Sequence, residues 1–138
     1  MEDAAAVVRR LFAAMNAHDA DLAAAVLHPD FTRIGPDGQL SATGPKEMAA
    51  LLDMYFVAFP DFDDQIRHLH RSGDSTVVTE VMVEGTHLGD MAGLAPTGRR
   101  IALPACIVWE VRDGLVFAER EYADFAFLMQ QLGVGAGA

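Results

Sequence analysis

The chain has 138 residues, 51% of them hydrophobic, and carries a formal net charge of −10. This length fits one domain with a sizeable core, and the acidic balance opposes nucleic-acid binding, which depends on clustered lysine and arginine. No apolar run approaches the roughly 20 residues of a membrane span. The first residues lack the basic and apolar regions of a secretory signal, and the single cysteine, Cys106, excludes an internal disulfide. We therefore expect a cytoplasmic protein that binds neither nucleic acid nor a membrane.

The first half of the chain predicts three helices. Apolar residues recur at helical spacing over residues 4–17. Asp19 is placed to cap a second, short helix over 20–27, which Pro29 ends because the residue before a proline resists the helical region. After a short strand over 31–34, Gly44-Pro45 begins a third helix, which runs to Phe59.

The second half changes to strand periodicity. Strands are predicted over 65–71, 75–86, 100–111 and 115–122, with a hairpin turn at Asp113-Gly114 between the last two. A short helix over 124–132 follows. Helices followed by a meander of strands indicate an α+β fold, a curved antiparallel sheet wrapped around the N-terminal helices to form a cone with one central pocket. We expect one domain over residues 1–133 and a frayed tail over 134–138.

Three groups of motifs occur in a characteristic order. The first is Phe59-Pro60-Asp61. The second is Gly85-Thr86-His87-Leu88-Gly89, followed by Pro96-Thr97-Gly98-Arg99. The third comprises Asp113-Gly114, Tyr122-Ala123-Asp124 and Gln130-Gln131-Leu132-Gly133. Over residues 7–133 this order and spacing resemble the SnoaL-like polyketide cyclase family, within the cone-shaped superfamily of nuclear transport factor 2 and ketosteroid isomerase.

The resemblance implies a cyclase that closes a polyketide ring by an intramolecular aldol reaction without a cofactor. It implies that Asp124, just before the terminal helix, is the acid/base residue, and that two copies of the chain form a homodimer. Relatives in the family include cofactor-free hydroxylases, epoxide hydrolases and isomerases. The chain departs from the classical cyclases on the strand before the Asp-Gly hairpin, which carries Trp109 and Glu110 where they use a histidine.

Asp124 has two interpretations. Side chains alternate along a strand, so Arg120, Tyr122 and Asp124 share one face at the end of the last strand. If that face lines the pocket, Asp124 is a carboxylate among apolar walls, which suits a general base. The alternative is a purely structural role, because aspartate is a favoured N-cap of a helix.

Other candidate pocket residues are weaker. Glu80 faces either solvent or the pocket, and His87 is either a proton shuttle or a side chain that fixes its loop. Arg33, Arg120, Trp109 and Tyr122 are candidates to polarise a substrate carbonyl. The full set of candidate pocket residues beside Asp124 is Arg33, Tyr55, Phe59, Glu80, Met82, His87, Trp109, Glu110, Arg120 and Tyr122.

The sequence predicts neither a metal nor a cofactor. His68 and His70 share a strand face but lack a third ligand at a recognised spacing. The chain has no glycine-rich nucleotide motif, no P-loop lysine and no Gly-x-Ser-x-Gly elbow.

Three functional hypotheses follow. The first is a cofactor-independent acid/base enzyme, a polyketide cyclase-like lyase or isomerase that acts on a small apolar or polycyclic carbonyl compound. The second is a cofactor-free hydroxylase, epoxide hydrolase or isomerase on the same scaffold. The third is a non-catalytic ligand-binding or dimerisation module. For the expected homodimer, the candidate contact surface is the strand of His68 and His70 with the even-numbered face of residues 75–86.

Overall fold

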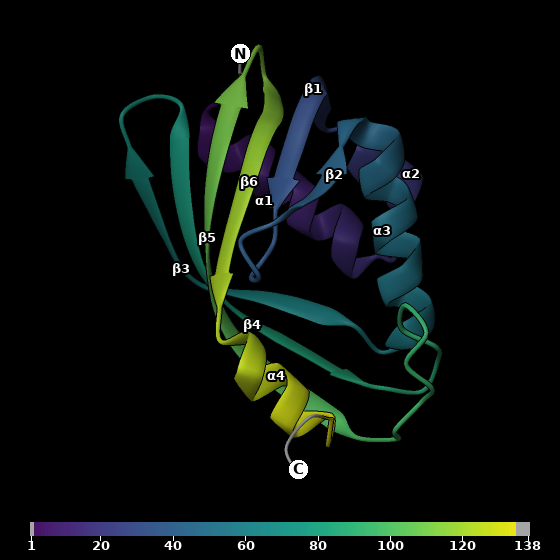
Figure 1. The fold of residues 1–138 in the computed structure, drawn as a ribbon. Helices are drawn as coiled ribbons and strands as arrows, with labels where there is room; N and C mark the ends of the chain where they lie inside the picture. The colour runs from purple at the N-terminus through teal and green to yellow at the C-terminus, as the bar shows by residue number, and fades with distance from the viewer. Residues whose placement is uncertain (1, 135–138) are drawn as a thin grey trace.

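One bent sheet, covered on its inner face by helices, makes up the fold (Figure 1). The computed structural model describes residues 2–134. Within them the helices are α1 (Ala4–Asn16), α2 (Ala20–Ala24), α3 (Gly44–Ala58) and α4 (Phe125–Gln131). The strands are β1 (Leu27–Ile34), β2 (Leu40–Thr43), β3 (Asp63–Ser72), β4 (Thr76–Thr86), β5 (Arg100–Arg112) and β6 (Leu115–Ala123). The predicted α+β class is confirmed, whereas residues 135–138 of the predicted tail over 134–138 lie outside the described residues.

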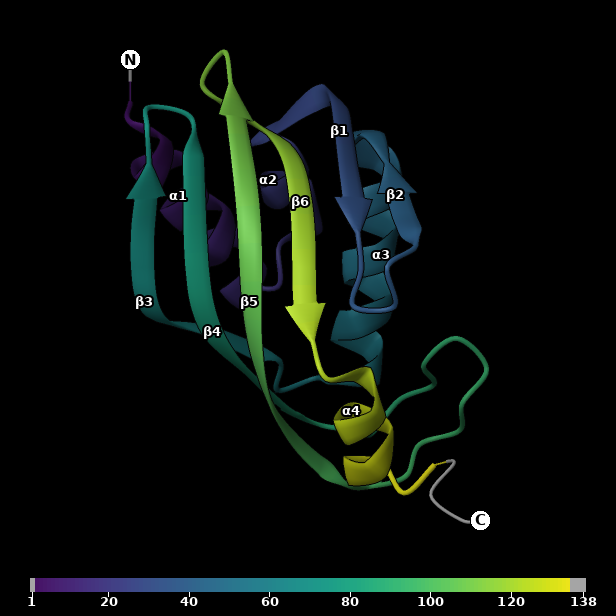
Figure 2. The ribbon, with the colours of Figure 1, turned by 60° about the vertical axis from the view of Figure 1, so that its left-hand side comes forward.

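The strand order is β2-β1-β6-β5-β4-β3. The pairs from β6 to β3 are antiparallel neighbours in sequence, as the meander predicted. The sheet departs from the expected antiparallel arrangement in one place, because β1 pairs with β6 in parallel. Figure 2 looks onto the outer face of the sheet, with α4 below the end of β6 and the loop over 88–98 beside it.

Two elements at the start of the sheet differ from the prediction. The second helix ends at Ala24, and β1 begins at Leu27, before Pro29. Proline lacks a backbone donor and is tolerated in a strand where regular pairing is interrupted. Pro29 lies within such an interruption, since the pairing of β1 with β6 shifts register between Leu27 and Thr32. The short strand β2 was not predicted; it pairs with β1 through Thr32, Arg33 and Ile34.

The core lies between the sheet and the helix layer. Along β5 alternate residues are buried, among them Ile107 and the fully buried Trp109. Phe12 of α1 meets the Trp109 ring edge-on, with 5.5 Å between ring centroids. Each large apolar side chain buried here stabilises the fold by about 1.5–3 kcal/mol. The odd-numbered residues of β5 therefore mark the inner face of the sheet.

The motifs that carry the family resemblance hold the end of α3 against the end of β4. The Asp61 carboxylate accepts hydrogen bonds from the Thr86 backbone N–H at 2.6 Å and from the Thr86 hydroxyl at 2.8 Å. Gly85 packs against Phe59 so closely that an added Cβ would lie 3.0 Å from the Phe59 Cβ. The backbone hydrogen bond from Thr86 lowers the pKa of Asp61, so this carboxylate stays ionised.

Candidate functional site

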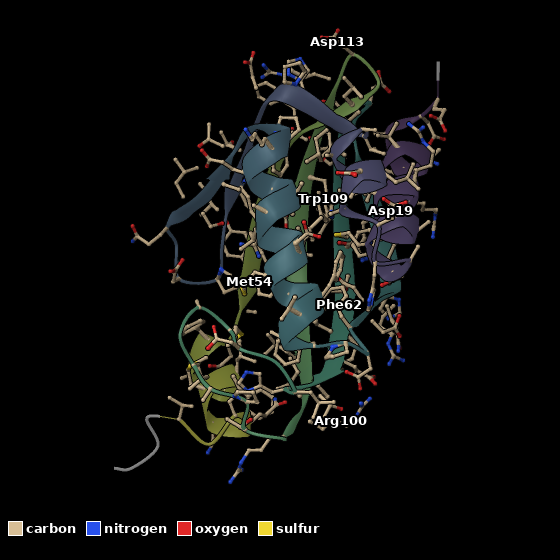
Figure 3. The ribbon with its side chains drawn as sticks, turned by 90° about the vertical axis from the view of Figure 1, so that its right-hand side faces the viewer. Asp19, Met54, Phe62, Arg100, Trp109 and Asp113 are labelled. Carbon is tan, nitrogen blue, oxygen red and sulfur yellow. The ribbon has the colours of Figure 1, made fainter. Side chains whose placement is uncertain are left out.

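A cavity of about 120 Å³ lies between the inner face of the sheet, α3 and α4. Figure 3 looks onto α3, with Trp109 and Phe62 to the right of the helix in this view. Most of the lining is apolar. The apolar side chains are Met15, Pro36, Met48, Leu52, Phe59, Phe62, Val83, Met91, Ile101, Leu103, Ile107, Trp109, Phe125 and Leu128. Phe125 of α4 is 45% exposed, which places the mouth of the cavity at this helix.

Within this apolar lining, Arg33 joins two glutamates. Arg33 on β1 lies directly opposite Glu119 on β6, and Glu121 follows two residues later on the same face. The Arg33 guanidinium donates to Glu119 Oε2 at 3.3 Å, to Glu121 Oε2 at 3.4 Å and to the Ser41 hydroxyl at 2.8 Å. Arg33 and Glu119 are about 95% buried. The second oxygen of Glu119, Oε1, is buried without a hydrogen-bond partner among the described residues.

Burial dominates the electrostatics of this cluster. It raises the pKa of Glu119 to about 7 even though Arg33 opposes the shift, and it raises the pKa of Glu121 in the same way. Burial alone would lower the pKa of Arg33, but the two carboxylates outweigh it and hold the guanidinium charged. Burial also raises the pKa of Tyr55, which lines the cavity beside them. The cluster can therefore exchange a proton near neutral pH.

Asp64 lines the same cavity from β3. Its backbone is held by Asn16 at the end of α1, whose side-chain amide donates to the Asp64 carbonyl at 2.9 Å and accepts from the Asp64 N–H at 2.8 Å. The carboxyl itself is left without such support, since its buried Oδ1 has no partner among residues 2–134. Burial raises the pKa of Asp64 well above its usual value, and the negative charges of Glu121 and Glu119 add to the shift.

Four of the residues proposed from the sequence line the cavity: Arg33, Tyr55, Phe59 and Trp109. Trp109 contributes apolar surface to the cavity and no hydrogen-bond donor for a substrate, because its indole N–H already donates to the Thr79 hydroxyl at 2.9 Å.

The other candidate side chains lie outside the lining of the cavity. Glu80 contacts His70 at 2.7 Å, and Arg120 donates to Glu110 at 3.2 Å. Met82 lies on the same face of β4 as Glu80, and Tyr122 is 59% exposed.

His87 is fully buried at the base of the loop over 88–98. Its Nδ1 accepts from the Thr97 N–H at 3.1 Å, and its backbone pairs with Gly98 and Arg99. Gly89 in this loop passes so close to the Val57 carbonyl oxygen that an added Cβ would lie 2.0 Å from it. These contacts favour the interpretation in which His87 fixes its loop.

Asp124 occupies the N-cap of α4. Its Oδ1 accepts from the Phe127 N–H at 2.9 Å, and the residue is exposed. The next residue, Phe125, lines the cavity, whereas Asp124 is not among the lining residues. The structure thus supplies the capping role, and an acid/base role for Asp124 stays a prediction from the resemblance.

A bulge explains why the sequence analysis overlooked Glu119 and Glu121. Val116 pairs with Val111, but Ala118 pairs with Glu110, so β6 carries one extra residue at Phe117. One extra residue moves every later side chain to the opposite face. The inner face of β6 therefore continues with Glu119 and Glu121 and not with the even-numbered residues. Asp64 gave no comparable signal, because a lone aspartate at the start of a strand is usually exposed.

A second hollow, of about 310 Å³, lies at the opposite end of the molecule, between the N-terminal residues and two hairpin turns. Asp113, which lines it, and Arg100, near the cavity, mark the two ends in Figure 3. None of the buried polar side chains of the described residues lines this hollow.

Residues 2–134 also contain no group of three or more side chains placed to hold a metal ion, and no helix in that range is long and apolar enough to cross a membrane. The cavity beside Arg33 is therefore the candidate active site.

The chain is similar to known polyketide cyclases along nearly its whole length. It is 28% identical over 137 residues to aklanonic acid methyl ester cyclase AcmA of Streptomyces galilaeus, covering 96% of this chain and 92% of the relative. It is 27% identical over 109 residues to nogalonic acid methyl ester cyclase of Streptomyces nogalater, covering 78% of this chain and 80% of the relative.

Solved structures share the fold at lower identity. TsrD from Streptomyces laurentii superposes with a TM-score of 0.81 at 22% identity, over 94% of this chain and 93% of the other. An LEH-like epoxide hydrolase of M. tuberculosis superposes with a TM-score of 0.74 at 22% identity, over 94% of this chain and 88% of the other. Residues 5–132 match the family described as SnoaL-like polyketide cyclase. The chain belongs to the SnoaL-like polyketide cyclase family.

Proposed function

We propose that the protein is a cofactor-independent acid/base enzyme that closes a ring in a polyketide-type carbonyl compound by an intramolecular aldol reaction. The observation that carries the proposal is Glu119, a buried carboxyl held by Arg33 in a mostly apolar cavity. Family membership and the similarity to two named cyclases support the reaction class.

In the proposed reaction, Glu119 takes a proton from the carbon next to a substrate carbonyl. A general base works best when its pKa lies near the working pH, and burial brings the pKa of Glu119 to about 7. The resulting enolate carbon attacks a second carbonyl of the same molecule and forms the new carbon–carbon bond. The hydroxyl of Tyr55, on the cavity wall, is a donor that could stabilise the enolate oxygen.

The charges in the cavity favour a neutral substrate. Among the described lining residues, the one guanidinium, that of Arg33, is already bonded to Glu119 and Glu121, so no free cation is left there to pair with a substrate carboxylate. A substrate carboxylate would add a further negative charge to a buried, low-dielectric site, which is strongly unfavourable. We therefore propose that the substrate is an ester and not a free acid. The names of the two cyclase relatives, which both specify a methyl ester, support this assignment.

The size of the cavity favours partial enclosure of the substrate. A volume of about 120 Å³ is small beside the roughly 300–1,000 Å³ of sites that enclose drug-sized ligands. We propose that only the reacting part of a polycyclic substrate enters the cavity, while the remainder extends past the exposed ring of Phe125 at the mouth.

Epoxide hydrolysis is the second candidate function. It is favoured by the two carboxyl groups that share Arg33, because an ionised Glu121 could activate water while a protonated Glu119 donates to the epoxide oxygen. Incubation with styrene oxide separates the candidates, since a hydrolase would release the diol and a cyclase would leave the epoxide intact.

A homodimer and a cytoplasmic location remain proposals from the sequence. The outer face of the sheet, with the exposed Tyr122 and the His70–Glu80 pair, is the candidate contact surface. Sedimentation at micromolar concentration should show a species of twice 14.9 kDa, and a lone 14.9 kDa species would contradict the dimer.

Turnover of nogalonic acid methyl ester by the purified protein tests the leading function. Glu119→Gln keeps the shape of the side chain and removes the proton acceptor, so we expect turnover to fall by roughly 10²–10⁴-fold, the usual scale of general acid/base catalysis. Glu110→Gln is the matched control, because Glu110 bonds to Arg120 and Thr76 away from the cavity. If Glu119→Gln kept the wild-type turnover, Glu119 would not be the general base. An absolute need for a metal or a nucleotide would contradict the proposed cofactor-independent reaction.

A further inference from the structure

Among residues 2–134, Asp64 is a buried acid without a cationic partner. It is 6% exposed, lines the cavity, and has a buried oxygen, Oδ1, with no hydrogen-bond partner among residues 2–134. A buried carboxylate normally persists only when it is paired with a cation or well hydrogen-bonded. A carboxyl group left in this state is either neutral or awaits a ligand.

The charged and titratable groups around Asp64 favour its neutral form. Asp63 precedes it on β3, and Glu119 and Glu121 act on it from β6. Arg33, the one basic residue among the described lining residues, is already bonded to both glutamates and to Ser41. From α1, Asn16 binds only the backbone of Asp64, and His18 binds the Phe62 carbonyl oxygen. Among the described residues, Asp64 therefore has negatively charged neighbours and no positively charged side chain that compensates for them.

Asp64 also lies across the cavity from the proposed base. Strands β4 and β5 separate β3, which carries Asp64, from β6, which carries Glu119. Three strand spacings amount to about 14 Å along a flat sheet. This sheet is bent (Figure 1), and both side chains line the same cavity. A substrate that fills the cavity contacts Glu119 at one side and Asp64 at the other.

We propose that Asp64 is the proton donor of the cyclisation, a neutral carboxylic acid that donates to the carbonyl oxygen which becomes the new hydroxyl. The inference rests on the proposed function. Glu119 removes the C–H proton, the enolate carbon bonds to the second carbonyl carbon, and that oxygen takes the O–H proton of Asp64. Asp64 is left as a carboxylate and Glu119 as an acid, so one proton passed back from Glu119 to Asp64, through water, restores the starting state.

Asn16 is the positioning residue for this acid. Its two hydrogen bonds fix the backbone of Asp64 without using the carboxyl, which leaves both carboxyl oxygens for the substrate. Because these bonds involve only the backbone of Asp64, the variant Asp64→Asn preserves them. Asparagine has the same shape and can donate a hydrogen bond, but it cannot transfer a proton.

The test compares Asp64→Asn with Asp63→Asn, the same chemical change one residue earlier, where the side chain lies outside the lining of the cavity. With nogalonic acid methyl ester, we expect turnover by Asp64→Asn to fall by roughly 10²–10⁴-fold and turnover by Asp63→Asn to stay at the wild-type level. Wild-type turnover should decline at high pH as Asp64 ionises, and this decline should be absent from the residual activity of Asp64→Asn.

A second measurement reads the proton directly. In ¹³C NMR, the carboxyl carbon of Asp64, assigned by its loss in Asp64→Asn, should report the protonated form at neutral pH and shift when the ester is added. An ionised Asp64 at neutral pH, or wild-type turnover by Asp64→Asn, would overturn the inference and leave the proposed function standing. If the wild-type protein fails to turn over the ester, the proposed function fails, and the same titration still decides whether Asp64 holds a proton.

Discussion

Arg33 is the shared hydrogen-bond donor of the site. It donates to the carboxyl groups of Glu119 and Glu121 and to the Ser41 hydroxyl. Removing one partner of a buried ion pair leaves an uncompensated charge, which costs more than the pair contributes. For this reason Arg33 is a structural requirement of the site as well as part of its chemistry.

The variant Arg33→Met should destabilise the protein by about 3–5 kcal/mol, since it strands Glu119 and Glu121 in the cavity without a cation. Urea unfolding measures this loss, and Arg100→Met is the control, because Arg100 forms exposed ion pairs with Asp61 and Glu84 that contribute about 0–1 kcal/mol. The double variant Arg33→Met/Glu119→Gln should recover part of the loss. Equal stability of Arg33→Met and the wild type would contradict the buried cluster.

The proton on Glu119 makes stability depend on pH. The pKa of Glu119 is about 7 in the folded state, against a usual value of 4.5, so between these two pH values the unfolded chain binds fewer protons than the folded chain. Stability therefore falls as pH rises through this window, by at most on the order of 3 kcal/mol from this group. Unfolding free energies at about pH 5 and about pH 8 should show the decline in the wild type and a smaller one in Glu119→Gln. Identical slopes in the two proteins would mean that Glu119 titrates normally.

At the scale of single residues, the sequence predicted the aromatic and basic lining residues of the cavity better than its carboxyl groups. Tyr55, Phe59 and Trp109 were candidates because large apolar side chains often line a pocket, and Arg33 was a candidate to polarise a substrate carbonyl; all four line the cavity. Glu119 and Glu121 could not be found by extending the same alternation, because the bulge at Phe117 has no distinctive residue pattern.

Among the elements, the long ones were predictable and the short ones were not. α1, α3 and the strands from β3 to β6 carry sustained periodicity, and their predicted bounds agree with the structure to within about two residues. β2 and the first half of β1 depend on tertiary pairing, since neither has a pattern long enough to register as a strand. The motifs of the family resemblance, from Phe59 to Gly89, hold the end of α3 against the end of β4 and supply little of the cavity chemistry.

Helix α4 closes one side of the cavity, and Asp124 is its cap. Asp124→Ala removes the acceptor for the Phe127 N–H and should cost about 0.5–2 kcal/mol, whereas Asp124→Asn keeps an acceptor and should cost only a few tenths. Because the Asp124 side chain is exposed and Glu119 is the proposed base, Asp124→Asn should also keep most of the turnover. Melting temperature and turnover, measured on both variants, test the two roles separately. A large loss of turnover in Asp124→Asn at unchanged melting temperature would assign the role of general base to Asp124 and not to Glu119, as the family resemblance implies.

At the scale of the whole molecule, the charge of the surface and the groups in the cavity both disfavour an anionic substrate. The chain carries a formal net charge of −10 at pH 7, and Arg33, the one guanidinium among the described lining residues, is already bonded to Glu119 and Glu121. The surface charge acts over a distance and is screened by salt, while the cavity charges act on a bound substrate in a low-dielectric site, where salt screens them little. The two contributions can therefore be separated by ionic strength.

The comparison of nogalonic acid methyl ester with the free acid should show this separation. We expect kcat/KM to favour the ester by roughly 10²-fold or more, because one uncompensated buried charge costs several kcal/mol. Raising the salt from about 20 mM to about 500 mM should narrow the ratio by weakening the long-range repulsion of the acid, without abolishing the preference. The double variant Glu119→Gln/Glu121→Gln, measured by binding instead of turnover, should bind the acid more tightly than the wild type does, because Arg33 is then released to pair with the ligand. Equal kcat/KM for ester and acid at low salt would show that the cavity does not select its substrate by charge.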